Sequence, residues 1–252
     1  MTIKTRGIVL AQTQLSSQDS VLTLLTSDLG LVDVYAKVSR GKKGRAAAAT
    51  EVLACSEFCL FKGKTRYILD AADLDTNFFR LREDLVSLSL AAYFCELCRF
   101  VMPDPESGGE VLRLLLNTLY LLEQKKRTPA FLKAVFELRL LTLCGFAPDT
   151  DGCAVCGTPG DDPGEFFWFL PAEGQLACAE CVSSLPPETA KLPMPPGVRL
   201  AFCHVIQSED KAVFSFKLSP DGEKAFADTA EAFTVFHLGG RFKSLDFYKS
   251  IL

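Results

Sequence analysis

The sequence contains few of the residues and motifs that enzymes use for catalysis. It has only two histidines, His204 in the apolar stretch AFCHVI and His237 near the end of a predicted helix, and neither lies beside a convincing nucleophile. The first is typical of a core histidine, and the positive form of the second would suit the negative end of a helix dipole. The Gly-x-Ser-x-Gly motif is absent. These absences favour a binding protein over an enzyme.

A nucleotide-binding loop is missing as well. Gly63-Lys64-Thr65 resembles the end of such a loop, but Phe58 occupies the position where the motif requires its first glycine. No helix is predicted to follow, although the motif needs one to complete its phosphate site. No paired carboxylates stand out from solvated charge either, so no residue set is predicted to catalyse a reaction.

Long apolar runs are also absent. None reaches the ~18 residues that span a bilayer, and the opening MTIKTRGIVLAQTQ has no apolar core of signal-peptide length. We therefore expect a soluble, intracellular protein of the cytoplasm and no membrane partner. In that reducing compartment the ten cysteines are not expected to form disulfides, so their spacing points to metal ligands instead.

An excess of positive charge is absent from the chain as a whole but present near its start. The net charge is −4, yet residues 1–80 carry eleven Lys or Arg against eight Asp or Glu, whereas residues 81–252 carry sixteen against twenty-three. The excess is densest in VSRGKKGRAAAA, residues 38–49. Between residues 34 and 66, eight basic residues face only Glu51 and Glu57. A basic surface this local predicts an anionic partner that binds there.

The first 76 residues predict short β-strands. Five apolar or alternating segments, at 7–14, 20–26, 31–38, 51–61 and 65–74, are separated by turn residues. In the third, Val32, Val34 and Ala36 alternate with polar residues, which indicates one buried face. Five short strands at hairpin spacing favour an OB-type β-barrel, with an SH3-like barrel as the alternative.

Residues 77–252 predict an α-helical domain. Apolar residues recur at helical spacing in 78–102, 108–126 and 128–146, and a later helix is expected over Asp221–His237. Thr128 and Pro129 form a helix-start signal. The prediction is an α+β protein, with an N-terminal five-stranded OB-type β-barrel domain over 1–76 and a helical domain over 77–252 that carries a four-cysteine zinc ribbon inserted at 150–182.

The cysteine segment is the most specific motif. Cys153-x2-Cys156 is followed, after twenty-one residues, by Cys178-x2-Cys181. Two such pairs complete the tetrahedron of thiolates that Zn²⁺ accepts, and four protein ligands leave no position open for catalysis, so we predict one structural zinc ion. Buried thiols, or a redox pair at Cys153 and Cys156, are the alternatives. The remaining cysteines are expected in the interior: Cys55, Cys59, Cys95, Cys98, Cys144 and Cys203.

The basic segment is predicted to bind single-stranded nucleic acid. Glycines let the backbone approach a phosphate, while nearby cations and aromatic rings hold the phosphates and bases of a strand. A solvated loop without function is the alternative. The candidate residues lie on one strand, the loop after it and the neighbouring hairpin: Tyr35, Lys37, Arg40, Lys42, Lys43, Arg45, Lys62, Lys64 and Arg66.

Three stretches of the sequence resemble the RecO family of DNA repair proteins. They are residues 7–44, the run FELRLLTLCGFAPD leading into GCAVCG, and the closing RFKSLDFYKSIL, and together they extend over nearly the whole chain. Their order and spacing are more specific than any one of them. The resemblance implies an N-terminal OB barrel, a C-terminal helical domain and the zinc site found in one branch of the family.

The resemblance also implies a function. It describes a recombination mediator that binds single- and double-stranded DNA, anneals complementary strands and acts with RecR to let RecA displace single-strand-binding protein (SSB). Family members hold the acidic, Phe-ended SSB tail through the helical domain, for which Lys133 and Arg139 are the candidates here. Arg241, Lys243 and Lys249 are candidates for a second DNA contact. The residues alone also allow an OB-fold, zinc-ribbon RNA-binding protein or a thiol oxidoreductase.

Overall fold

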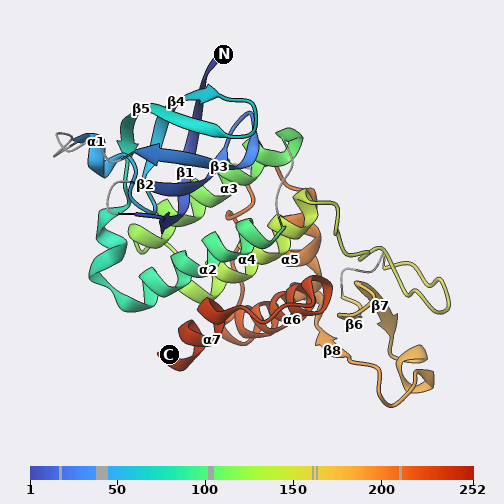
Figure 1. Ribbon diagram of the computed structural model, residues 1–252. Helices are drawn as coiled ribbons and strands as arrows, with labels where there is room; N and C mark the ends of the chain where they lie inside the picture. The colour runs from blue at the N-terminus through green and yellow to red at the C-terminus, as the bar shows by residue number, and fades with distance from the viewer. Residues whose placement is uncertain (17–18, 38–44, 102–104, 161, 163, 210–211) are drawn as a thin grey trace. The chain divides into compact units, whose positions relative to one another are not determined.

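The computed structural model describes residues 1–16, 19–37, 45–101, 105–160, 162, 164–209 and 212–252 (Figure 1). Contacts group the chain into two compact units, one formed by Met1–Gln124 with Phe242–Leu252 and the other by Lys125–Arg241. Each unit is described by itself. The predicted boundary between two domains, after residue 76, is a statement about which parts of the chain fold independently, and it stays a prediction.

The first unit begins with the five predicted strands. They are β1 (Thr2–Gln14), β2 (Asp19–Thr26), β3 (Gly30–Lys37), β4 (Cys55–Lys62) and β5 (Tyr67–Thr76), with a short helix α1 (Arg45–Ala48) between β3 and β4. The pairing order β1-β2-β3-β5-β4 closes on itself, because β4 also pairs with β1. All pairs are antiparallel except β3 with β5. Because β5 pairs between β3 and β4, the order of strands in the sheet differs from their order along the chain. This five-stranded topology agrees with the expected OB-type arrangement.

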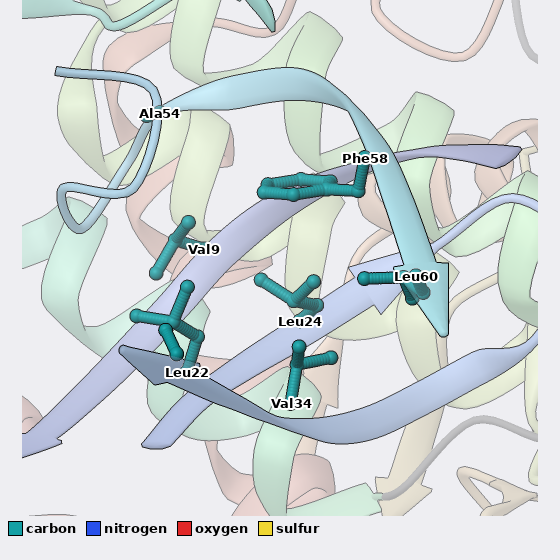
Figure 2. Close-up of a cluster of buried hydrophobic side chains, with 8 residues drawn as sticks. Val9, Leu22, Leu24, Val34, Ala54, Phe58 and Leu60 are labelled. Carbon is teal, nitrogen blue, oxygen red and sulfur yellow. The ribbon is translucent and has the colours of Figure 1, made fainter. Parts of the chain in front are cut away.

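Apolar side chains fill the inside of the closed sheet. Figure 2 shows Val9, Leu22, Leu24, Val34 and Phe58 pointing toward one another from four of its segments, and all are fully buried or nearly so. Successive residues of a strand point to opposite sides, so polar residues between the buried ones face solvent. The period-two pattern predicted for β3 is therefore confirmed at Val34 and Ala36, which are buried, while Val32 is partly buried and packs against the same core.

Helices complete the first unit: the 3-10 turn Phe79–Glu83, α2 (Leu85–Val101), α3 (Pro105–Glu123) and α7 (Lys243–Ser250). The prediction of a single helix over 78–102 is wrong in one respect, because the chain forms the 3-10 turn first and starts α2 only after Asp84. Asp84 has extended backbone angles, and its carboxylate accepts from the Ser87 N–H at 3.2 Å, so it starts α2 as an N-cap. On α3, a side chain at Gly108 would lie 2.8 Å from the Cα of Gly30, which explains the glycine at this close approach.

The end of the chain returns to the first unit through α7. The Phe242 ring packs edge-on against Tyr93, with ring centroids 5.9 Å apart, and against Phe100 at 5.2 Å. The Glu96 carboxylate accepts from both the N–H and the hydroxyl of Ser244. These contacts attach the start of α7 to α2.

The second unit consists of three helices and a small sheet. The helices are α4 (Pro129–Leu143), α5 (Pro196–Gln207) and α6 (Pro220–Leu238). The sheet contains β6 (Phe167–Leu170), β7 (Gln175–Cys178) and β8 (Leu192–Met194), with the 3-10 turn Cys181–Ser184 after β7. The Thr128 hydroxyl accepts from the Phe131 N–H, so the predicted start of α4 is confirmed. In the described residues, no helix has the length and apolar character needed to span a membrane.

Replacing Phe58 by Ala is expected to destabilise the first unit by about 3–5 kcal/mol, because Phe58 is 1% exposed and its loss leaves a cavity inside the closed sheet. Phe61→Ala is the matched control: Phe61 lies on the same strand but is 48% exposed, so its cost should stay within about 0.5 kcal/mol. Urea-dependent hydrogen exchange of the β4 amides measures both. Equal destabilisation by the two variants would contradict the described core.

Candidate metal centre and nucleic-acid interface

Four cysteine side chains meet at one point of the second unit. The Sγ atoms of Cys153, Cys156, Cys178 and Cys181 all lie within 4.8 Å of one another, and those of Cys156 and Cys178 are 3.9 Å apart. A tetrahedral ion with metal–sulfur bonds of ~2.3 Å separates its sulfurs by about 3.8 Å. The group could therefore hold a metal ion with little rearrangement.

Backbone hydrogen bonds build this centre from two separate turns. The Cys153 N–H donates to the Thr158 carbonyl at 2.8 Å, and the Gly157 N–H donates to the Cys153 carbonyl at 2.9 Å. Gly157 has a φ of +73°, which glycine adopts without strain. The Ala154 N–H donates to the Leu176 carbonyl at 2.8 Å and joins this turn to β7. Cys178 ends β7 and Cys181 starts the next turn, so both pairs face the same point.

The thiols of this centre differ in how easily they ionise. Burial opposes ionisation of Cys153, but backbone N–H groups around it lower its pKa to about 6. The Thr158 hydroxyl lowers the pKa of Cys156. Hydrogen bonding with Cys156 and Cys178 raises the pKa of Cys181 to about 12. A cation among the sulfurs would remove this difference, because it stabilises each thiolate directly.

The other cysteines are divided between the interior and its edge. Cys55, Cys95 and Cys98 are buried, as predicted. Burial raises the pKa of Cys95 to about 12. The prediction is wrong for the remaining three, which are only half-buried: Cys59 lies on the outward side of β4, Cys144 at the end of α4, and Cys203 within α5.

The predicted nucleic-acid residues meet partly at one end of the closed sheet. Lys62, Lys64 and Arg66, here called the basic hairpin, are exposed on the turn between β4 and β5. The Gly63 N–H donates to the Arg66 carbonyl at 3.0 Å and closes this turn. The Arg66 guanidinium lies 5.2 Å from the centroid of the Tyr35 ring, which is a cation–π contact.

The surroundings of Tyr35 contain charge of both signs. Lys37 is exposed at the end of β3 and lies opposite Asp19 on β2. The pKa of the Tyr35 hydroxyl is raised, because desolvation and a hydrogen bond with Asp19 outweigh the opposite effect of the Arg66 charge. The ring is thus held between a carboxylate and a guanidinium. Arg40, Lys42 and Lys43 lie outside the described residues, as does the side chain of Arg45.

Of the two residues predicted for the SSB tail, Lys133 is buried and Arg139 is half-buried. Lys133 is 4% exposed, and its ammonium lies 2.9 Å from Glu137 and 2.8 Å from Glu231. The Arg139 guanidinium donates to the carbonyls of Val205 and Ile206 at 3.2 and 2.8 Å. Both cations have partners within the second unit, and their assignment to the SSB tail stays a prediction.

The remaining predicted residues are placed at the chain's last segments. Arg241, Lys243 and Lys249 are all exposed. His237 ends α6 as predicted, but burial lowers the pKa of its imidazole. The neutral form is therefore favoured, and the expectation that a positively charged His237 interacts with the helix dipole is wrong. The imidazole is half-buried, and its centroid lies 4.3 Å from that of the Phe233 ring.

A cavity that the sequence did not reveal lies in the first unit. It has a volume of about 360 Å³, and its charged lining residues are Glu96, Arg99 and Lys243. Arg99 and Lys243 are exposed, so positive charge adjoins solvent there. The cavity is formed by four segments that are far apart in the sequence, so no local sequence motif could have predicted it. Its other lining residues are mostly apolar: Leu10, Val52, Leu53, Leu88, Ala92, Cys95 and Ser244.

Comparisons with known proteins give consistent matches along the chain. The family model "Recombination protein O N terminal" matches residues 1–78, and "Recombination protein O C terminal" matches residues 82–246. The chain is 29% identical to the DNA repair protein RecO of Acetivibrio thermocellus, over 99% of this chain and 97% of that protein. It is 36% identical to that of Rubrobacter xylanophilus, over 77% and 76%. It is 31% identical to that of an Anaeromyxobacter species, over 99% and 96%.

Replacing Cys178 by Ser is expected to reduce bound metal from about one ion per chain to less than about half, because a hydroxyl is a poor substitute for a thiolate ligand. Cys144→Ser is the control for the loss of a thiol in the second unit, since Cys144 lies outside the sulfur group. Elemental analysis of the purified proteins measures the content. Full metal occupancy in Cys178→Ser would contradict the four-cysteine centre.

Proposed function

The chain belongs to the RecO family of DNA repair and recombination proteins, and from this premise we propose that it is a recombination mediator. In this proposal it binds single- and double-stranded DNA and anneals complementary strands. With RecR, it promotes loading of RecA onto DNA coated by SSB. Each step is one of binding and displacement, so no bond is made or broken and no catalytic residue is required.

The basic hairpin beside Tyr35 is the observation that carries this proposal. Three exposed cations on one tight turn can neutralise phosphates and release their counterions. Tyr35 and the half-exposed Phe61 offer ring faces to bases, as in other proteins that hold single strands. Annealing needs two strands to approach with reduced repulsion while their bases stay free to pair. A small basic surface that mainly contacts backbones satisfies both needs.

The basic loop after β3 extends this surface in the proposal. Arg40, Lys42, Lys43 and Arg45 follow directly on the strand that carries Tyr35, and glycines 41 and 44 permit close approach to phosphate. Replacing Lys42, Lys43 and Arg45 by Ala should weaken DNA binding and flatten its salt dependence, because phosphate contacts are lost.

A second, weaker DNA contact is assigned in this proposal to Arg241, Lys243 and Lys249.

The ion at the four cysteines is proposed to be Zn²⁺ in a structural role. Thiolates in a tetrahedron suit zinc, and four protein ligands leave no position for a water molecule that could react. When bound, zinc supplies a fixed link between the two cysteine turns. A thiol oxidoreductase would need only two of these cysteines, so the convergence of all four favours the metal over redox chemistry.

The cavity on α2 is proposed as a second candidate site for the SSB tail, beside the predicted Lys133 and Arg139. An acidic segment that ends in a phenylalanine needs an apolar pocket beside positive charge. The cavity has an apolar lining, and exposed Arg99 and Lys243 adjoin it. Glu96 lines it too, but the carboxylate is already hydrogen-bonded to Ser244. RecR and RecA are proposed as partners only because the chain belongs to the RecO family.

Replacing Lys62, Lys64 and Arg66 by Ala is expected to weaken binding of single-stranded DNA about tenfold at physiological salt. It should also lower the slope of log affinity against log salt by about two, because three phosphate contacts are lost. The charge-matched control replaces Lys191, Lys217 and Lys224, which are exposed in the second unit. Fluorescence anisotropy over a salt series measures both. An unchanged slope in the hairpin variant would contradict the proposed interface.

The same titration with RNA of identical sequence separates the proposal from its main alternative, an RNA-binding protein. A mediator of recombination should bind the DNA strand at least as tightly as the RNA strand. A strong preference for RNA, through contacts to its 2′-hydroxyls, would count against a role in repair.

Filling the cavity by Ala92→Trp is expected to weaken binding of an acidic, Phe-ended peptide about tenfold, because Ala92 is an exposed lining residue and a larger side chain occupies the space. Arg99→Ala should weaken it and reduce its salt dependence. Arg113→Ala, a change of an exposed arginine on α3, serves as control. Calorimetry with the peptide gives the affinities. Wild-type affinity in Ala92→Trp would exclude this cavity.

A further inference from the structure

The segment that carries the metal centre is strongly acidic. Between residues 140 and 190 the sequence has eight Asp or Glu and no Lys or Arg. Of these carboxylates, Asp149, Asp151, Asp162, Glu173, Glu180 and Glu188 are exposed, and Glu165 is half-buried. No ion pair of the described residues reaches any of them. Four thiolates around a divalent ion would leave the centre itself anionic. Such a surface repels phosphate, so nucleic acid does not suit it.

The small sheet in this segment has two different faces. On one face, Phe169 is buried and its ring lies 5.4 Å from that of Phe202 on α5 and 5.7 Å from that of Phe233 on α6. On the other, Trp168 is only half-buried and lies between Ala177 of β7 and Pro193 of β8 in register. Figure 1 shows these three short strands side by side in the second unit.

An aromatic pair remains accessible on this second face. Phe166 is 40% exposed, and its ring packs edge-on against Trp168 with centroids 5.9 Å apart. Phe166, Trp168 and Pro193 are here called the Trp168 face. Two carboxylates directly precede it, because the turn in which the Glu165 N–H donates to the Asp162 carbonyl at 3.1 Å leads into Phe166. Accessible aromatic rings with a charged rim are typical of protein-binding surfaces.

We propose that the Trp168 face docks a basic, amphipathic segment of a protein partner. One apolar side chain of that segment packs against Phe166 and Trp168, and its lysines or arginines pair with the carboxylates around them. Charge complementarity selects this occupant, since the eight acidic residues of 140–190 outnumber the two cations beside them, exposed Lys191 and buried Arg199. A surface with this excess of negative charge opposes an acidic segment as well as nucleic acid. The inference does not depend on the proposed DNA function, because it concerns a different unit and a different sign of charge.

The sole tryptophan of the chain lies on this face and reports its occupancy. The experiment titrates the full-length, metal-loaded protein with a short synthetic peptide of arginine, lysine and leucine and follows Trp168 fluorescence. Three probes serve as controls: the peptide with serine in place of leucine, the peptide with glutamate in place of its cations, and a single-stranded oligonucleotide. We expect a salt-sensitive change with the first peptide and binding at least about tenfold tighter than with any control.

Two variants test the assignment to this face. Phe166→Ala should weaken binding of the arginine-leucine peptide about tenfold, whereas Phe236→Ala should not. Phe236 is the matched control because it is 51% exposed but lies on α6, the helix that covers the opposite face of the sheet. Glu165→Gln, which leaves both rings in place, should reduce the salt dependence. Metal content confirms that each variant is folded.

Several results would overturn the proposal. Equal binding of the leucine-free peptide would mean that charge alone attracts it, and a fluorescence change with the oligonucleotide would make this a nucleic-acid surface. A change that grows with protein concentration and without any peptide would identify a second copy of the chain as the occupant. No binding of the first peptide at low salt would exclude a docking surface.

Discussion

The closure of the five-stranded sheet is the constraint on which the first unit depends. A closed sheet buries one side of every strand, so each strand must alternate, and every second side chain is sent to solvent. This alternation buries Val34 while it exposes Lys37, and it brings Tyr35 beside Arg66 across the parallel pair of β3 and β5. The basic hairpin needs no motif of its own, because a tight turn between two paired strands is enough to cluster its cations.

Local patterns predicted the parts of the structure that local forces determine. The five strands, the start of α4 at Thr128 and the convergence of two cysteine pairs all follow from short-range spacing and capping. Features made by distant segments were not predictable. The interruption at Asp84, the return of α7 through Phe242 and the cavity beside Arg99 depend on which surfaces pack together, and no periodicity records that. The i,i+4 spacing of Lys133 and Glu137 is a local signal for an ion pair, but nothing in the sequence around Lys133 predicts its second partner, the half-buried Glu231 of another helix.

The charge of the chain is divided in a way that suits two kinds of partner. The mildly acidic total conceals a basic turn in the first unit and an acidic segment around the four cysteines in the second. The carboxylates around Cys153–Cys181 oppose a nucleic-acid contact at the cysteine group, because they repel phosphate. In our account the closed sheet meets DNA, the metal centre holds its segment in shape, and the Trp168 face is free for a protein.

The central claim is that the basic hairpin lets this protein anneal DNA that SSB has coated. The most direct measurement is the annealing rate of complementary SSB-coated strands, followed by energy transfer between dyes on the two strands. We predict that the wild-type protein accelerates annealing and that loss of Lys62, Lys64 and Arg66 removes most of the acceleration. An intact, DNA-binding protein that leaves the rate at its uncatalysed value would contradict the account, as would full acceleration by the hairpin variant.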